Sequence, residues 1–143
     1  MIIKQLSVFV ENKEGRLADI TATLAEAKVD IRALSLADTT DFGILRLIVD
    51  KPEEAVLALK EAGLTVSLTN VIAIGIDDKP GGFARAVRVL SDAQISVEYL
   101  YAYVSRSEEL ACVILRVEDN DNAIKALSDA EIRLLSQGDM FDM

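Results

Sequence analysis

Two stretches decide the fold of this chain because each repeats the pattern of the other: LSVFVENKEGRLADITATLAEAKVDIRAL at residues 6–34 and IAIGIDDKPGGFARAVRVLSDAQISVEYL at residues 72–100. A shift of 66 residues places Gly15 on Gly81 and aligns the two stretches without a gap. Past the following loop the shift becomes 68, and the extra residues fall in the polar turn at residues 105–109, where insertions are easily tolerated. The sequence therefore indicates an internal duplication.

Within each copy, apolar residues alternate between the spacing of strands and the spacing of helices. In the first copy Leu6, Val8 and Val10 recur at every second residue, which predicts a strand with one buried face. The runs at residues 31–38 and 42–50 flank a short polar turn and predict a hairpin. Helical spacing follows the first strand of each copy, at Leu17, Ile20, Leu24 and Ala27 and at Phe83, Val87, Leu90 and Ala93.

A second helix and a closing strand complete the predicted unit. The helix should begin near Pro52, a residue tolerated in the first turn, and end at Gly63, and residues 64–68 should form the strand. The resulting order β-α-β-β-α-β is the split βαβ arrangement known as ferredoxin-like. Right-handed crossovers then place both helices on one face of the sheet.

The two copies are joined with almost no linker, since only Thr69 and Asn70 separate the last strand of one from the first strand of the next. We expect two α+β units at residues 1–69 and 70–143, with their antiparallel sheets joined side by side and all helices on one face. A unit of this size buries little surface alone, so we expect the two to dock.

The composition argues against several classes of function. A net charge of −9 disfavours nucleic acids and anionic membranes as partners. The chain has no histidine, the commonest general base and metal ligand, and we expect no metal and no other cofactor. Cys112, the only cysteine, lies in an apolar run and is expected to be a buried structural thiol. The sequence shows neither a leader-like nor a membrane-spanning segment, so the expected location is the cytoplasm.

The residues best suited to bind a ligand form the turn between the first strand and the first helix of each copy, at residues 11–17 and 77–83. Their glycines allow a ligand to approach the backbone, and the first N–H groups of the helix can bind a carboxylate or a phosphate. The alternative is an ordinary turn in which Asn12 or Asp78 caps the helix by accepting hydrogen bonds from these N–H groups.

The first loop and the β-α-β-β-α-β order of each copy together resemble an ACT domain. The resemblance covers essentially the whole chain, because the domain is present twice. The resemblance rests on a first loop that reads Asn or Asp, any residue, Pro or Glu, Gly, any residue and then an apolar residue. A small polar residue before an apolar one at the start of the second strand completes the pattern. ACT domains sense amino acids in metabolic enzymes, and a chain with no attached enzyme resembles the stand-alone tandem ACT proteins of bacteria.

The resemblance implies that such units pair through their second strands into one eight-stranded sheet. An amino acid is then held in each seam, between the first loop of one unit and the start of the second strand of its partner. One predicted site combines Asn12, Gly15, Arg16 and Leu17 with Ser96, Val97 and Glu98. The other combines Asp78, Pro80, Gly81, Gly82 and Phe83 with Asp30, Ile31 and Arg32.

Three residues depart from the family pattern. Glu14 replaces the usual proline of the first loop and puts a negative charge beside a carboxylate site. Asp78 and Asp30 replace neutral amides, which should strengthen binding of an ammonium group. The site at the second loop is therefore expected to be the stronger of the two.

Three tyrosines, Tyr99, Tyr101 and Tyr103, alternate and should share the sheet face opposite the helices. They are expected either to cover that face against a second copy of the chain, in a homodimer, or to line the ligand pocket. Arg46 and Arg116 fall on the same face, where solvated guanidinium groups are the first expectation and a dimer contact is the alternative.

These features predict a non-catalytic regulator of amino-acid metabolism that binds a free amino acid and, as further partners, a second copy and a metabolic enzyme. The alternative is an oligomerisation or adaptor subunit of such an enzyme that senses no ligand.

Enzymatic use of the fold is disfavoured, because an acylphosphatase-like site needs an arginine placed over a phosphate. Arg16 follows the glycine and stands near Glu14, and the second copy has Gly82 there. A metal-chaperone site would need paired cysteines in the loop, and the sequence has none there.

Overall fold

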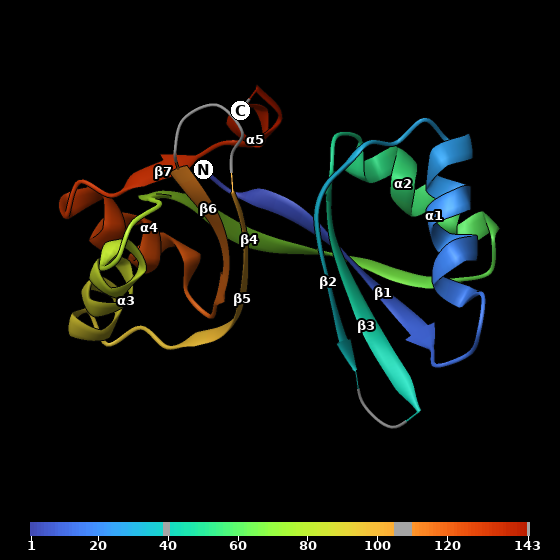
Figure 1. Ribbon diagram of the computed structural model, residues 1–143, viewed down its shortest axis with the longest axis horizontal. Coiled ribbons are helices and arrows are strands. Elements are labelled where there is room, and N and C mark those ends of the chain that lie inside the picture. The colour runs from blue at the N-terminus through green and yellow to red at the C-terminus, as the bar shows by residue number, and fades with distance from the viewer. Residues whose placement is uncertain (39–40, 105–109, 143) are drawn as a thin grey trace. The chain divides into compact units, whose positions relative to one another are not determined.

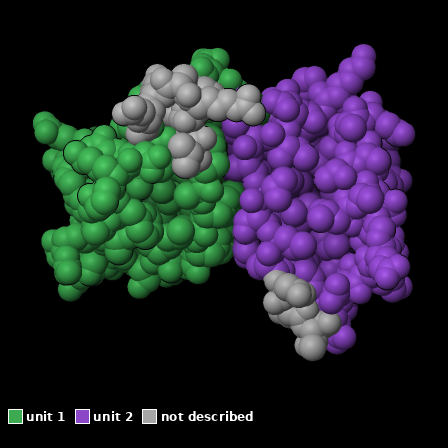
Figure 2. All heavy atoms as spheres, in the orientation of Figure 1, with its two compact units in different colours: residues 1–3, 70–143 green, residues 4–69 purple. Residues whose placement is uncertain are grey.

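The computed structural model describes residues 1–38, 41–104 and 110–142. The chain divides into two compact units, which we call the N-terminal unit (residues 4–69) and the C-terminal unit (residues 1–3 and 70–143; Figure 2). The turn residues Thr39 and Thr40, and the insertion expected at residues 105–109, lie outside the described residues.

Helices and strands follow the order β-α-β-β-α-β in both copies, so the fold is α+β with two tandem ferredoxin-like units (Figure 1). The first copy contains β1 (Ile3–Glu11), α1 (Arg16–Glu26), β2 (Ile31–Asp38), β3 (Phe42–Val49) and α2 (Pro52–Glu61). It is closed by β4 (Thr65–Asp77), which also opens the second copy. The second copy continues with α3 (Gly82–Asp92), β5 (Val97–Val104), β6 (Leu110–Val117), α4 (Asn120–Asp129), β7 (Arg133–Leu135) and α5 (Gln137–Asp142).

In both units the second strand of the copy lies at an edge of the described sheet. The strand order is β2-β3-β1 in the N-terminal unit, where Leu34 of β2 lies opposite Leu47 of β3. It is β5-β6-β4-β7 in the C-terminal unit, where Leu100 of β5 lies opposite Leu115 of β6. The two registers correspond, since the shifts of 66 and 68 residues carry one pair onto the other.

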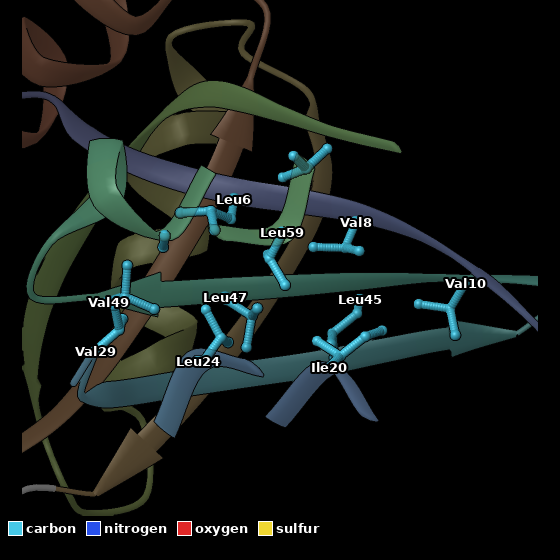
Figure 3. Close-up of a cluster of buried hydrophobic side chains, with 12 residues drawn as sticks. Leu6, Val8, Val10, Ile20, Leu24, Val29, Leu45, Leu47, Val49 and Leu59 are labelled. Carbon is cyan, nitrogen blue, oxygen red and sulfur yellow. The ribbon is translucent and has the colours of Figure 1, made fainter. Parts of the chain in front are cut away.

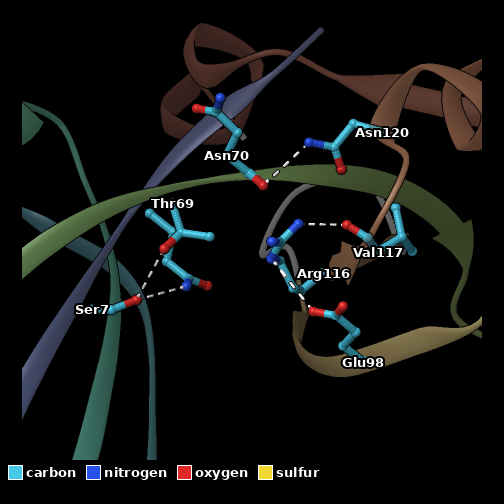
Figure 4. A network of polar contacts seen from close by, with 8 residues as sticks. Ser7, Thr69, Asn70, Glu98, Arg116, Val117 and Asn120 are labelled. Atoms are coloured by element: carbon cyan, nitrogen blue, oxygen red, sulfur yellow. Dashed lines mark hydrogen bonds and ion pairs between the residues drawn. The ribbon is translucent and has the colours of Figure 1, made fainter.

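β4 runs without interruption through Thr69 and Asn70, where the sequence predicted a connection between two strands. Polar neighbours accommodate these residues within each unit: Ser7 Oγ lies 3.5 Å from Thr69 Oγ1, and Asn120 Nδ2 donates to the Asn70 carbonyl oxygen at 3.3 Å (Figure 4). One strand of 13 residues therefore closes the first copy and opens the second.

Both helices of each copy pack on the same face of their sheet, as predicted. In the N-terminal unit β1, β3, α1 and α2 contribute to one core (Figure 3), which includes Leu6, Val8, Val10, Ile20, Leu24, Leu45, Leu47 and Leu59. The C-terminal unit repeats this arrangement with Ile72, Ile74, Ala86, Leu90, Leu115 and Leu127.

The buried stripe of the first helices is narrower than the helical spacing predicted. α3 buries Ala86 and Leu90, whereas Phe83 and Val87 are 41% and 37% exposed. At 3.6 residues per turn, the Phe83–Val87 row is rotated by about 60° from the Ala86–Leu90 row and lies on the flank of the helix. Leu17 of α1, the counterpart of Phe83, is likewise 43% exposed.

The short helix α5 was not predicted, because its six residues are too few for a periodic pattern. What marks the start of α5 in the sequence is the pair Ser136 and Asp139, which form a capping box. The Ser136 N–H donates to Asp139 Oδ2 at 2.9 Å, and the Asp139 N–H donates to Ser136 Oγ at 3.1 Å. Hydrogen bonding of the Asp139 carboxylate with the Ser136 backbone N–H first, and with the Ser136 side chain second, lowers the pKa of this carboxyl. Neither α5 nor any other described helix is long and apolar enough to cross a membrane.

Cys112 of β6 is buried, as its apolar neighbours predicted. Burial raises the pKa of its thiol, which disfavours the reactive thiolate. Cys112 is therefore a packing residue.

Candidate ligand-binding loops

The first helix of each copy begins immediately after a glycine in the left-handed conformation. Gly15 precedes α1 with φ +82°, and Gly81 precedes α3 with φ +91°. Residues other than glycine rarely adopt these angles, so this conformation explains both glycines without reference to a ligand. The equivalence of Gly15 and Gly81 predicted by the repeat is confirmed.

Neither α1 nor α3, whose loops are fully described, has a side-chain hydrogen bond at its N-cap. The turns are closed by the backbone instead, with the Arg16 N–H donating to the Lys13 carbonyl at 3.3 Å and the Gly82 N–H to the Lys79 carbonyl at 3.1 Å. The interpretation in which Asn12 or Asp78 caps its helix is therefore wrong. The first N–H group of each helix is thus used by the backbone, and no side chain caps the N–H groups that follow it in the first turn.

The loop of the N-terminal unit lines a hollow of about 130 Å³ and brings together Asn12, Arg16 and Leu17 of the predicted site. Leu36 of β2 and Gly43 of β3 form part of its wall. The hollow is rich in charge that is already paired: Lys13 Nζ lies 2.9 Å from a Glu11 carboxylate oxygen, and Arg16 Nη2 lies 3.9 Å from the same oxygen. The hydrogen bond from Lys13, followed by the charges of Lys13 and Arg16, lowers the pKa of Glu11.

The loop of the C-terminal unit is tighter at Gly82. A Cβ atom at this position would overlap the Asp77 carbonyl oxygen, so a residue with a side chain does not fit without a shift of the backbone. The first copy accommodates Arg16 at the equivalent position. Gly82, predicted as a ligand contact, thus has a sufficient reason in local packing, while Asp78 and Pro80 are exposed.

The strand starts that were predicted to complete the sites are held by local interactions. The Asp30 N–H donates to Asp50 Oδ1 at 2.9 Å, and Arg32 Nη2 lies 4.0 Å from Asp30 Oδ2. At the equivalent of Arg32, the Glu98 carboxylate lies 3.6 Å from Arg116 Nε (Figure 4). Both strands carry a register irregularity at this point, between residues 31 and 33 and between residues 97 and 99.

A sequence model of one family, described as an ACT domain pair, matches residues 1–143. The chain belongs to this family. No curated protein matches the ACT pair.

Solved structures support the same assignment. A crystal structure of a protein from Bacteroides thetaiotaomicron is 36% identical to the ACT pair, covers 100% of this chain and 98% of its own, and has a TM-score of 0.94. The ligand-free regulatory subunit of aspartate kinase from Thermus thermophilus is 18% identical, with coverage of 89% and 91% and a TM-score of 0.63. Aspartate kinase from Synechocystis is 21% identical, covers 93% of the ACT pair but 26% of its own chain, and has a TM-score of 0.60. At these identities the two kinase structures show the fold alone.

The two halves of each predicted seam site belong to different units of the ACT pair. In the first predicted site the loop residues belong to the N-terminal unit and the strand residues to the C-terminal unit: Asn12, Gly15, Arg16 and Leu17, then Ser96, Val97 and Glu98. In the second predicted site the loop residues belong to the C-terminal unit and the strand residues to the N-terminal unit: Asp78, Pro80, Gly81, Gly82 and Phe83, then Asp30, Ile31 and Arg32. The structure brings together the residues of each loop and those of each strand start. That a loop meets a strand start remains a prediction.

The tyrosines of β5 share the sheet face opposite the helices, as predicted, since Tyr99 lies opposite Arg116 and Tyr103 opposite Cys112 in the β5–β6 ladder. Arg116 is not the solvated residue that the sequence suggested. Its side chain is 28% exposed, pairs with Glu98 and donates to the Val117 carbonyl. The homodimer that these tyrosines suggested remains a prediction.

Proposed function

We propose that this ACT pair is a non-catalytic, cytoplasmic regulatory protein that binds a free α-amino acid at its first loops. One observation carries the proposal: both copies present a helix that starts at a left-handed glycine, and no side chain caps the N–H groups that follow the first one. Each helix also exposes an apolar residue in its first turn, Leu17 or Phe83. Such a loop offers N–H donors to the ligand carboxylate and apolar surface to its side chain.

A second ACT unit completes each site in this proposal. β2 and β5 are edge strands of their described sheets, and edge strands have backbone groups that can pair with another chain or unit. Asp30 and Asp78 are the candidate partners of the ligand ammonium, and both are exposed. The second-loop site is proposed as the stronger, because Glu14 places negative charge at the first loop.

A regulatory role is supported by the family itself and by the regulatory subunit of aspartate kinase among the similar structures. A metabolic enzyme is thus the proposed downstream partner. The second candidate function is an adaptor subunit that uses its strand edges and tyrosine face to assemble with such an enzyme, without sensing a ligand.

The test is thermal stabilisation of the full chain by each of the twenty amino acids, followed by calorimetry on matched variants. Phe83→Ala and Leu17→Ala remove side chains that are 41% and 43% exposed in equivalent first turns, and Leu57→Ala removes a 62% exposed side chain from α2 as the control. Substitutions at such exposed positions change stability by about 0.5 kcal/mol or less, so a loss of affinity reports on binding.

We expect Phe83→Ala to weaken binding several-fold, Leu17→Ala to weaken it less, and Leu57→Ala to leave it unchanged. Gly81→Val is unsuitable, because a β-branched residue at φ +91° strains the loop whether or not a ligand binds. Failure of every amino acid to stabilise the protein refutes the proposal and favours the adaptor function.

A further inference from the structure

A pocket at the same place in both copies has diverged between them. In the N-terminal unit the ends of β1 and α2 and the starts of α1, β3 and β4 surround about 160 Å³. In the C-terminal unit the equivalent residues surround about 290 Å³. The shifts of 66 and 68 residues carry every lining residue of the smaller pocket onto one of the larger, whose lining also includes Arg85.

The clearest difference between the two linings is Gly75. Its counterpart Phe9 lines the smaller pocket and packs against Phe42, with ring centroids 5.1 Å apart. The C-terminal unit has Gly75 and Leu110 at these positions. The lining of the larger pocket therefore contains neither of the two aromatic rings.

Nothing in the backbone requires glycine at residue 75. Its φ is outside the left-handed range, and a Cβ atom there would meet its nearest neighbours, Arg133 Cδ and Leu135 Cδ2, at 3.7 Å, an ordinary contact distance. The β4–β6 register is continuous through this residue. Glycine inside a strand lowers stability and, where no bulge or bend explains it, is typical of a place where a ligand or another backbone approaches the sheet closely.

The larger pocket also differs in charge. Arg85 and Arg133 line it, whereas Asp19 and Thr65 occupy the equivalent positions of the first copy. Arg85 donates through Nη2 to the Ala130 carbonyl, which holds the guanidinium at the wall and uses one of its five N–H donors. Two arginines in one pocket are notable in a chain of net charge −9.

Two acidic residues, Asp77 and Glu131, are the other charged residues of the lining, which also includes Gly82 of the first loop. Asp77 is already matched by Lys79, whose Nζ lies 3.6 Å from its carboxylate. The guanidinium groups of this lining can bind the carboxylate of a ligand. The carboxylates beside them can accept hydrogen bonds from an ammonium group on the same ligand.

We propose that the pocket around Gly75, which adjoins the first loop of the second copy at Asp77 and Gly82, is a second ligand site that binds a small metabolite through its carboxylate. Arg85 and Arg133 bind the carboxylate, and the hollow that Gly75, Ile76 and Ile132 help to line accommodates the body of the ligand. The volume of about 290 Å³ suits a molecule the size of an amino acid or a small organic acid. The N-terminal unit, with Phe9 and Thr65, has lost or never acquired this site.

The experiment uses the full chain labelled with ¹⁵N and the amino acids and two organic acids, succinate and citrate, as probes at millimolar concentration. We expect at least one probe to shift the amide resonances of Gly75, Ile76 and Arg133. Binding of amino acids but not of succinate or citrate would identify the ligand as an amino acid, and the reverse would identify an organic acid. If no probe shifts these resonances, the proposal is overturned.

Variants that copy the first repeat locate the binding. Gly75→Phe and Arg133→Thr introduce the side chains that the first copy has at the equivalent residues, Phe9 and Thr65. Gly75→Phe should block the pocket, and Arg133→Thr should remove a charge-assisted hydrogen bond to the ligand carboxylate. Each should reduce the affinity for the ligand about tenfold or more. Arg88→Thr, on an exposed part of α3, is the matched control and should leave affinity unchanged. Should Gly75→Phe fail to fold, Arg133→Thr, at an exposed position, carries the test.

The same spectra separate this site from the proposed function. Probes that shift only the resonances of Asp78 and Phe83 would support the first-loop site and overturn the Gly75 pocket. Shifts confined to Gly75 and Arg133 that survive Phe83→Ala would support the pocket and count against the first loops. Equal affinity in Gly75→Phe and the parent protein would overturn the pocket even if binding occurs.

Discussion

The absence of side-chain caps on α1 and α3 can be tested against a helix in the same chain that has one. Asp119 caps α4, accepting from the Asn122 N–H at 3.1 Å and from Asn122 Nδ2 at 2.9 Å. Asp119→Ala removes an N-cap, which costs about 1 kcal/mol of unfolding free energy, and lowers Tm by roughly 3 °C for a chain of this size. Asn12→Ala and Asp78→Ala break no cap and should change stability by less than about 0.5 kcal/mol.

Urea unfolding followed by circular dichroism measures all three variants, since the chain has no tryptophan to report by fluorescence. A loss for Asp78→Ala or Asn12→Ala equal to that for Asp119→Ala would refute the reasoning. It would mean that these side chains do occupy the first-turn N–H groups, which would then be unable to bind a carboxylate. The proposed ligand loops would be ordinary capped turns.

Three further predictions concern binding, assembly and acid stability. Asp30→Ala should weaken amino-acid binding about tenfold or more and Asn12→Ala much less, because Asp30 is assigned to the stronger site, and equal losses by calorimetry would mean that both sites work. Sedimentation at micromolar concentration should show a dimer or larger assembly that Tyr101→Glu dissociates, and a monomer of 15.6 kDa alone would contradict this. Since Ser136 lowers the pKa of Asp139, the stability from this carboxylate is present above its ordinary pKa and is lost as pH falls through the lowered value. Asp139→Asn should therefore reduce the loss of stability between roughly pH 4 and pH 2, measured by urea unfolding at each pH.

Much of the fold could be predicted because burial leaves a periodic record in the sequence. The alternation of Leu6, Val8 and Val10 placed a strand correctly, and the predicted hairpin agrees with β2 and β3 to within one residue. The predicted start of the second helix at Pro52 is also confirmed. Repetition strengthened each of these predictions, since two copies of one pattern rarely agree by chance.

Neither the continuity of β4 nor the absence of side-chain caps on α1 and α3 could be predicted. The first depends on partners distant in the sequence, and the second on the backbone angles of a glycine. Thr69 and Asn70 are typical of a turn, yet their neighbours Ser7 and Asn120 accommodate them inside β4. Asn12 is a common capping residue, but the left-handed glycine that follows it leaves the helix without a side-chain cap.

The sequence alone determined that this chain contains two ferredoxin-like copies and that their first loops are the best candidates for a ligand. The tertiary structure decided which apolar residues stay exposed, as at Phe83, and where space is left, as at Gly75. The physical reason is that periodicity reports the environment of one element. A pocket forms where several elements meet, and the missing side chain of Gly75 has meaning only beside Leu110 and Arg133, which the fold brings to it.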